Sequence, residues 1–100
     1  MSQAKIYISG KISGIENEAP KLFKDAENYL NKIGYYPINP MELNHNHDKS
    51  WHSYMKEDVK ALCDCDKIYM LSNYKDSKGA IIELEIANYL GIDVIYQNKK

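Results

Sequence analysis

The sequence contains no arginine, although its 100 residues include 13 lysines. Arginine is the side chain that grips a phosphate through two parallel hydrogen bonds, so any phosphate site must use lysine, hydroxyls and backbone amides instead. The formal net charge is only -1, which gives no general attraction to a polyanion. We therefore expect neither nucleic acid nor a membrane surface as a partner.

Cysteines and long apolar runs are also scarce. Cys63 and Cys65 are too close in sequence for an ordinary structural disulfide, so we expect two buried, reduced thiols. No apolar run is long enough to span a bilayer, and the N-terminus enters a strand pattern without the shape of a signal peptide. These absences predict a soluble, cytoplasmic protein. The length of 100 residues predicts one domain over residues 1–100, and the lysine pair at its end is expected to be solvated.

Strand and helix patterns alternate along the chain. We predict strands at 5–9, 35–38, 67–71 and 93–97, and helices at 20–33, 51–65 and 80–90. Pro37 would place the second strand at a sheet edge, because proline cannot donate to the ladder. Alternation with short connections predicts an α/β fold, a flavodoxin/Rossmann-like three-layer sandwich whose four-stranded parallel sheet has the order 2-1-3-4.

Two acidic residues fall on helix faces that are otherwise apolar. On a helical wheel, Glu83 lies inside the apolar arc of the third helix and Asp58 inside that of the second. The arcs consist of Ala80, Leu84, Ile86, Ala87 and Leu90 in the third helix, and Trp51, Tyr54, Met55, Ala61, Leu62 and Cys65 in the second. A phase error of a residue or two would explain one such case, or a side chain that reaches solvent past the helix end. Two cases favour a functional site, because a buried carboxylate is unfavourable unless it is hydrogen-bonded or paired.

The position of Glu83 suggests a chemical role. Ligands of parallel α/β sheets bind at the carboxyl ends of the strands, where the following helices begin. Glu83 is predicted in the first turn of the third helix, where the helix dipole would help keep it ionised and competent as a nucleophile. If Asp58 converges on it, the pair resembles the carboxylates of retaining glycoside chemistry, where one attacks C1 and the other manages a proton.

Three segments carry a resemblance to a known family: IYISGKISG at 6–14, YMKEDVKALCDCDKIYML at 54–71 and SKGAIIELEIANYLGIDVIY at 77–96. They are similar to the nucleoside 2-deoxyribosyltransferase-like superfamily, which includes the deoxynucleoside 5′-monophosphate N-glycosidases. The resemblance covers nearly the whole chain. It implies that Glu83 is the nucleophile that captures deoxyribose, that Asp58 assists it, and that Tyr7 holds the nucleophile or the sugar.

The same resemblance implies the surroundings of the site. The residues that would cradle the 5′ end of the sugar are Gly10, Lys11, Ile12, Ser13 and Gly14. Ser77 and Gly79 match positions at the pocket mouth, where family members often complete a neighbour's site. A homodimer or higher homo-oligomer is therefore implied, with a small-molecule nucleoside or nucleotide as substrate and no cofactor.

The chain departs from the family pattern at its first loop. Family loops commonly carry a proline, or in the monophosphate hydrolases a serine and an arginine, where this chain has Lys11 and Ser13. A phosphate would have to bind to a lysine, two hydroxyls and free backbone amides at a helix start. Glu85 stands where larger relatives usually place a glycine, which is compatible with the smaller members.

A polar loop before the second helix holds a cluster of metal-ligand residue types, namely His45, His47, Asp48 and His52. Their spacing fits no standard motif, so we predict no metal site. We expect a lid over the pocket instead, with Asn39, Pro40 and His47 touching the base. Trp51 and the tyrosines are expected in the core or a subunit interface rather than as a substrate platform.

The sequence thus predicts an enzyme that cleaves the N-glycosidic bond of a deoxynucleoside or its 5′-monophosphate, passing the sugar to water or to another base. Two alternatives stay open. A glutamate in this kind of fold could instead cleave the nicotinamide bond of NAD, or a modified or signalling nucleotide. The domain could also be a non-catalytic nucleotide-binding module, because fold alone does not establish chemistry.

Overall fold

The computed structural model describes residues 3–45 and 47–98, and its sheet has the predicted topology. The strands are β1 (Lys5–Ser9), β2 (Tyr36–Ile38), β3 (Lys67–Met70) and β4 (Asp93–Tyr96). All pair in parallel, in the order β2-β1-β3-β4, so Pro37 lies on an edge strand as expected. The C-terminal lysine pair, expected to be solvated, lies outside the described residues.

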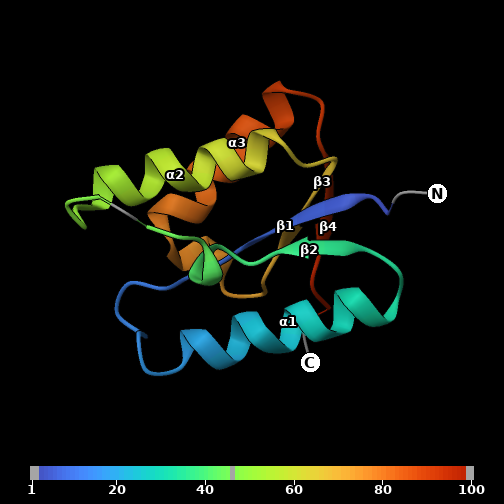
Figure 1. Ribbon diagram of the computed structural model, residues 1–100, viewed down its shortest axis with the longest axis horizontal. Coiled ribbons are helices and arrows are strands. Elements are labelled where there is room, and N and C mark those ends of the chain that lie inside the picture. Colours follow the sequence, from blue (N-terminus) through green and yellow to red (C-terminus); the bar gives the residue numbers. More distant parts are fainter. Residues whose placement is uncertain (1–2, 46, 99–100) are drawn as a thin grey trace.

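Three helices cover the two faces of the sheet. Helix α1 (Ala19–Lys32) lies on one side, and α2 (Trp51–Cys63) and α3 (Lys78–Tyr89) lie together on the other (Figure 1). Successive residues of a strand point to opposite faces. Ile6 and Ile8 accordingly pack with the helix on one side, while Tyr7 packs with the helix pair on the other. The three-layer α/β sandwich is therefore confirmed.

Element boundaries differ from the sequence predictions by one or two residues. Helix α3 begins at Lys78 rather than residue 80, because the Ser77 side chain accepts a hydrogen bond from the Ala80 amide and caps the helix there. Two stretches expected to be loop contain short 3-10 helices, η1 (Pro40–Glu42) and η2 (Tyr74–Asp76). No helix in the described part of the chain combines the length and apolar character needed to cross a membrane.

Two burial predictions are wrong. Cys63 is exposed whereas Cys65 is buried, because Cys63 follows the buried Leu62 by one helical step, which turns it toward solvent. Leu90, expected in the apolar arc of the third helix, is 56% exposed. It is the C-cap of α3, where the chain leaves the packed helix.

We predict that Gly10→Ala lowers the free energy of unfolding by about 1–3 kcal/mol, the usual range for overpacking. A Cβ at this position would lie 2.6 Å from Leu71 Cδ1 and 2.8 Å from Leu71 Cβ, and Leu71 is buried. Chemical denaturation measures the change. Lys11→Ala, one residue further along, is the control and should change stability by about 0.5 kcal/mol or less. Equal stability of Gly10→Ala and the parent would contradict the packing argument.

Candidate active site

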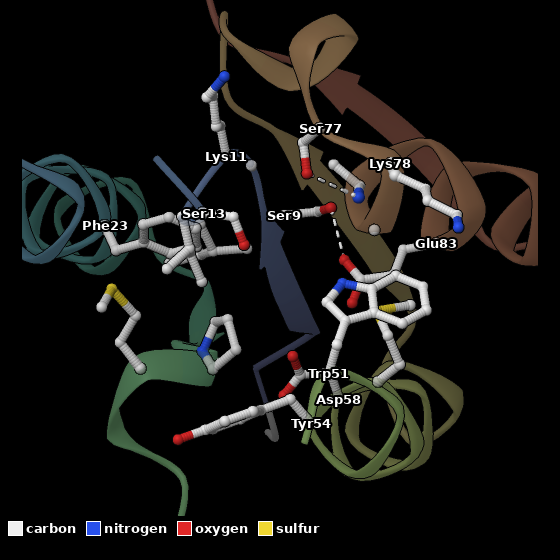
Figure 2. A pocket seen from close by; sticks show the side chains of 18 of the residues that line it. Ser9, Lys11, Ser13, Phe23, Trp51, Tyr54, Asp58, Ser77, Lys78 and Glu83 are labelled. Atoms are coloured by element: carbon white, nitrogen blue, oxygen red, sulfur yellow. Dashed lines mark hydrogen bonds between the residues drawn. The ribbon is translucent and has the colours of Figure 1, made fainter. Parts of the chain in front are cut away.

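A cavity of about 550 Å³ opens at the carboxyl edge of the sheet, and both predicted acids line it. Figure 2 shows Asp58 from α2 and Glu83 from α3 pointing toward the same space, with the Trp51 ring beside them. The structure thus brings together two carboxylates that are 25 residues apart in the sequence. The cavity has the size and mixed lining typical of small-molecule sites.

Glu83 is 5% exposed, and hydroxyl groups from β1 hold both of its carboxylate oxygens. The Tyr7 hydroxyl donates to Oε2 at 2.9 Å, and the Ser9 hydroxyl donates to Oε1 at 2.7 Å. Tyr7 and Ser9 are two residues apart on one strand, so they share the face that looks toward α3. The strand therefore presents two adjacent donors to one buried carboxylate.

Burial raises the pKa of Glu83 to about 7, and the charge of Asp58 adds to that increase. The hydrogen bonds from Ser9 and Tyr7 act in the opposite direction. The prediction that Glu83 lies in the first turn of the helix, where the dipole would help keep it ionised, is wrong. Because α3 begins at Lys78, Glu83 lies in its second turn, where the dipole effect has faded and desolvation dominates. Burial also raises the pKa of Tyr7 well above its ordinary value, so the phenol keeps its proton and remains a donor.

Asp58 has no comparable set of donors. Its side chain is 13% exposed, and its Oδ1 atom is buried without a hydrogen-bond partner among the described residues. His45 Nε2 lies 3.8 Å from this oxygen, which is too far for a hydrogen bond. Burial, and next the charge of Glu57, raise the pKa of Asp58 to about 7. The protonated acid is therefore favoured at Asp58 relative to an ordinary aspartate.

The loop that carries His45, His47 and Lys49, here called the histidine loop, contains a series of hydrogen bonds beside Asp58. The Lys49 amide donates to His47 Nδ1 at 3.0 Å, His47 Nε2 pairs with His45 Nδ1 at 3.1 Å, and His45 Nε2 pairs with the Pro40 carbonyl at 3.0 Å. Because a carbonyl can only accept, His45 carries its proton on Nε2, and His47 then donates to His45. Within residues 3–45 and 47–98, no group of three or more His, Cys, Asp or Glu side chains is arranged to hold a metal ion.

Most of the expected binding residues line the cavity. Those that do are Tyr7, Gly10, Lys11, Ile12, Ser13, Pro40, Ser77 and Gly79. Gly14 and Asn39 are not among the lining residues of the described chain. Asn39 instead accepts a hydrogen bond from the Met41 amide at 3.0 Å and donates to Glu27 at 3.1 Å, which ties η1 to α1. In the histidine loop, His45 rather than His47 lines the cavity.

The loop after β1 and the start of α3 offer fewer free backbone amides than the sequence suggested. The Lys11 amide donates to Asn73 Oδ1 at 3.0 Å, and the Gly14 amide donates to Glu16 at 3.1 Å. The Ala80 amide is taken by Ser77. These three amides therefore already have acceptors. The other polar groups on this side of the cavity include the Ser13 hydroxyl and the Lys11 ammonium, which donates to the Asp76 carbonyl at 3.4 Å and has further protons to donate.

Sequence reasoning missed several lining residues. Ser9 was detectable in principle, because it lies two positions after Tyr7 on the same strand. Trp51 was expected in the core or an interface, but it is 39% exposed and lines the cavity together with Tyr54. Both lie on the helix face of Asp58, at positions i-7 and i-4, so the arc that looked like core is in part a cavity wall.

Similar known proteins identify the family and the fold of this chain. Residues 4–96 match the model of DUF4406, a domain of unknown function. Curated protein sequences give no match. Among solved structures, the chain is similar to a 2-deoxyribosyltransferase from the psychrotolerant bacterium Bacillus psychrosaccharolyticus. The TM-score is 0.71 at 26% sequence identity, over 93% of this chain and 71% of the other. The fold expected from the resemblance is thereby confirmed. The chain belongs to the DUF4406 family and has the nucleoside 2-deoxyribosyltransferase-like fold.

Proposed function

We propose that this protein cleaves the N-glycosidic bond of a deoxynucleoside or deoxynucleoside 5′-monophosphate, with Glu83 as nucleophile and Asp58 as acid. The similar solved structure is named a 2-deoxyribosyltransferase, which supports a reaction at C1′ of deoxyribose. The roles of Glu83 and Asp58 follow from the surroundings of their side chains. Transfer to water and transfer to a second base are both compatible with the site.

The unequal surroundings of the two acids are the observation that carries the proposal. Glu83 accepts two hydroxyl hydrogen bonds, which favour its charged form, whereas Asp58 Oδ1 has no partner in the described chain. When two nearby carboxyls share one proton, the negative charge resides on the group with the better donors. The singly protonated pair is therefore ionised at Glu83 and protonated at Asp58, as a nucleophile and an acid require.

The reaction is balanced by these two groups alone. A Glu83 oxygen forms a bond to C1′ through an oxocarbenium-like transition state, while the bond from C1′ to the base nitrogen breaks. The bonding electrons pass to the base, which takes the proton of Asp58. Water or a second base then attacks C1′, the ester to Glu83 breaks, and Asp58 recovers the proton from the attacking group.

The remaining lining residues suit the two ends of such a substrate. Trp51 and Tyr54 supply apolar ring surface for a base. Lys11, Ser13 and Ser77 supply polar groups for the 5′ end of the sugar, with or without a phosphate. A homo-oligomer that completes the mouth near Ser77 and Gly79 stays a prediction.

Replacement of Glu83 by Gln should lower base release by about a thousandfold or more, because the amide cannot form the glycosyl ester. The assay is chromatography of a panel of nucleosides, their 5′-monophosphates and NAD, each with and without an added free base. Glu85→Gln is the matched control, since Glu85 is on the same helix but exposed, and it should keep full activity. Undiminished turnover by Glu83→Gln would end the proposal, and base release from NAD alone would reassign the substrate.

The pH profile of kcat/KM should be a bell centred near neutrality. Activity rises as Glu83 ionises through a pKa of about 7 and falls as Asp58 loses its proton through a pKa of about 7, the apparent values belonging to the pair. Asp58→Asn should lower kcat about a hundredfold and remove the alkaline limb. The acidic limb should stay in place, because Asp58 is still protonated and therefore uncharged while Glu83 ionises, as the replacing amide also is.

Asp64→Asn is the control for this profile, because Asp64 is exposed at the end of α2. Its bell should coincide with that of the parent. Retention of both limbs by Asp58→Asn would remove Asp58 from the reaction.

A further inference from the structure

Ser9 is the last residue of β1, and it lines the cavity. It is 1% exposed, and its carbonyl accepts a hydrogen bond from the Leu71 amide at 2.8 Å, which fixes its backbone to the chain beyond β3. Gly10, the next residue, lies against Leu71 so closely that no Cβ would fit. The position of the Ser9 hydroxyl is therefore set by the sheet and has little freedom to adjust.

The hydroxyl of Ser9 is directed at the proposed nucleophile (Figure 2). Its 2.7 Å distance to Glu83 Oε1 is in the range of charge-assisted bonds between a hydroxyl and a carboxylate, about 2.5–2.7 Å. The Tyr7 hydroxyl occupies the other oxygen, Oε2. Two bonds on two different oxygens fix the plane of the carboxylate, whereas a single bond would let it turn about that contact.

The hydrogen bond from Ser9 also affects whether Glu83 is charged or protonated. A protonated Glu83 would carry an O–H on one oxygen, so the hydroxyl bound to that oxygen would have to turn and accept, or donate to a poorer acceptor. The pair of hydroxyls therefore selects the ionised carboxylate, against the effects of burial and of the nearby Asp58. With Tyr7 as the only donor, the preference for charge on Glu83 over Asp58 would weaken.

We propose that Ser9 is a positioning residue of the reaction, whose hydroxyl, together with that of Tyr7, holds both oxygens of the Glu83 carboxylate before a substrate binds. The catalytic part of this inference rests on the proposed function. Its physical part, the hold of Ser9 on Glu83, does not need a substrate and is tested separately.

The substrate-free test is a titration of Glu83 by NMR, with glutamate labelled at the side-chain carboxyl carbon. Glu83→Gln assigns the resonance. Ser9→Ala should raise the pKa of Glu83 by about one unit, because it removes one hydrogen bond to a charged group. Ser9→Thr retains the hydroxyl and should titrate like the parent. Circular dichroism and chemical denaturation verify that each variant is folded.

The second test measures kcat and KM against pH for the same variants, with the substrate that the panel identifies. Ser9→Ala should move the acidic limb up by about one pH unit and lower kcat about fivefold at pH 7, with KM nearly unchanged and the rate recovering at higher pH. Ser9→Thr should restore the limb. A merely structural role would lower the rate at every pH and leave the limb in place.

The outcomes separate the two proposals. An unchanged Glu83 titration in folded Ser9→Ala would overturn the role of Ser9, even if the enzyme cleaves nucleosides. An unchanged acidic limb, or a rate loss at every pH that Ser9→Thr does not rescue, would overturn it as well. A shifted titration without base release from any substrate would support the hold of Ser9 on Glu83 but refute the proposed function, and Ser9 would then have no part in catalysis.

Discussion

The hydrogen bonds from Tyr7 and Ser9 to the buried Glu83 carboxylate are the interaction on which the site depends. A carboxylate that is 5% exposed is unfavourable unless donors satisfy it. The fold supplies them through strand alternation, which aligns two hydroxyls on one face of β1, and through α3, which carries Glu83 over that face. The strand order places β1 between β2 and β3. Tyr7 is paired with a residue of each neighbouring strand, and Ser9 is paired with Met70 of β3.

Asp58, the second acid of the site, differs from Glu83 because one of its oxygens lacks a hydrogen-bond donor in the described chain. Asp58 is partly buried and raised in pKa, but its inner oxygen has no donor in the described chain, and the nearest ring nitrogen of His45 is committed to the Pro40 carbonyl. The proposed function rests on this difference in surroundings, with Glu83 as the charged nucleophile and Asp58 as the proton donor at the same pH. The hydrogen bonds of the loop that carries His45 fix which nitrogen of this ring carries the proton beside Asp58.

The fold was predictable because its signals are periodic. Alternating strand and helix patterns led to the parallel sheet in the observed order, and the helical wheels placed Asp58 and Glu83 on inward faces. The wheels could not distinguish a core from a cavity wall, since both are apolar, so they did not reveal that Trp51 lines the cavity. The capping by Ser77 lengthened α3 and moved Glu83 out of its first turn. The hydrogen bonds of Asn39 and the Lys11 amide join segments distant in sequence, which no local pattern reveals.

The central claim is that Glu83 forms a covalent bond to the sugar. Mass spectrometry of the protein after incubation with a 2′-fluoro-2′-deoxynucleoside tests it most directly, because the fluorine destabilises the oxocarbenium-like transition state and slows release of the glycosyl ester. The account predicts an added mass equal to the fluorinated sugar, carried by the peptide that contains Glu83. Base release without any adduct, or an adduct on another residue, would contradict it.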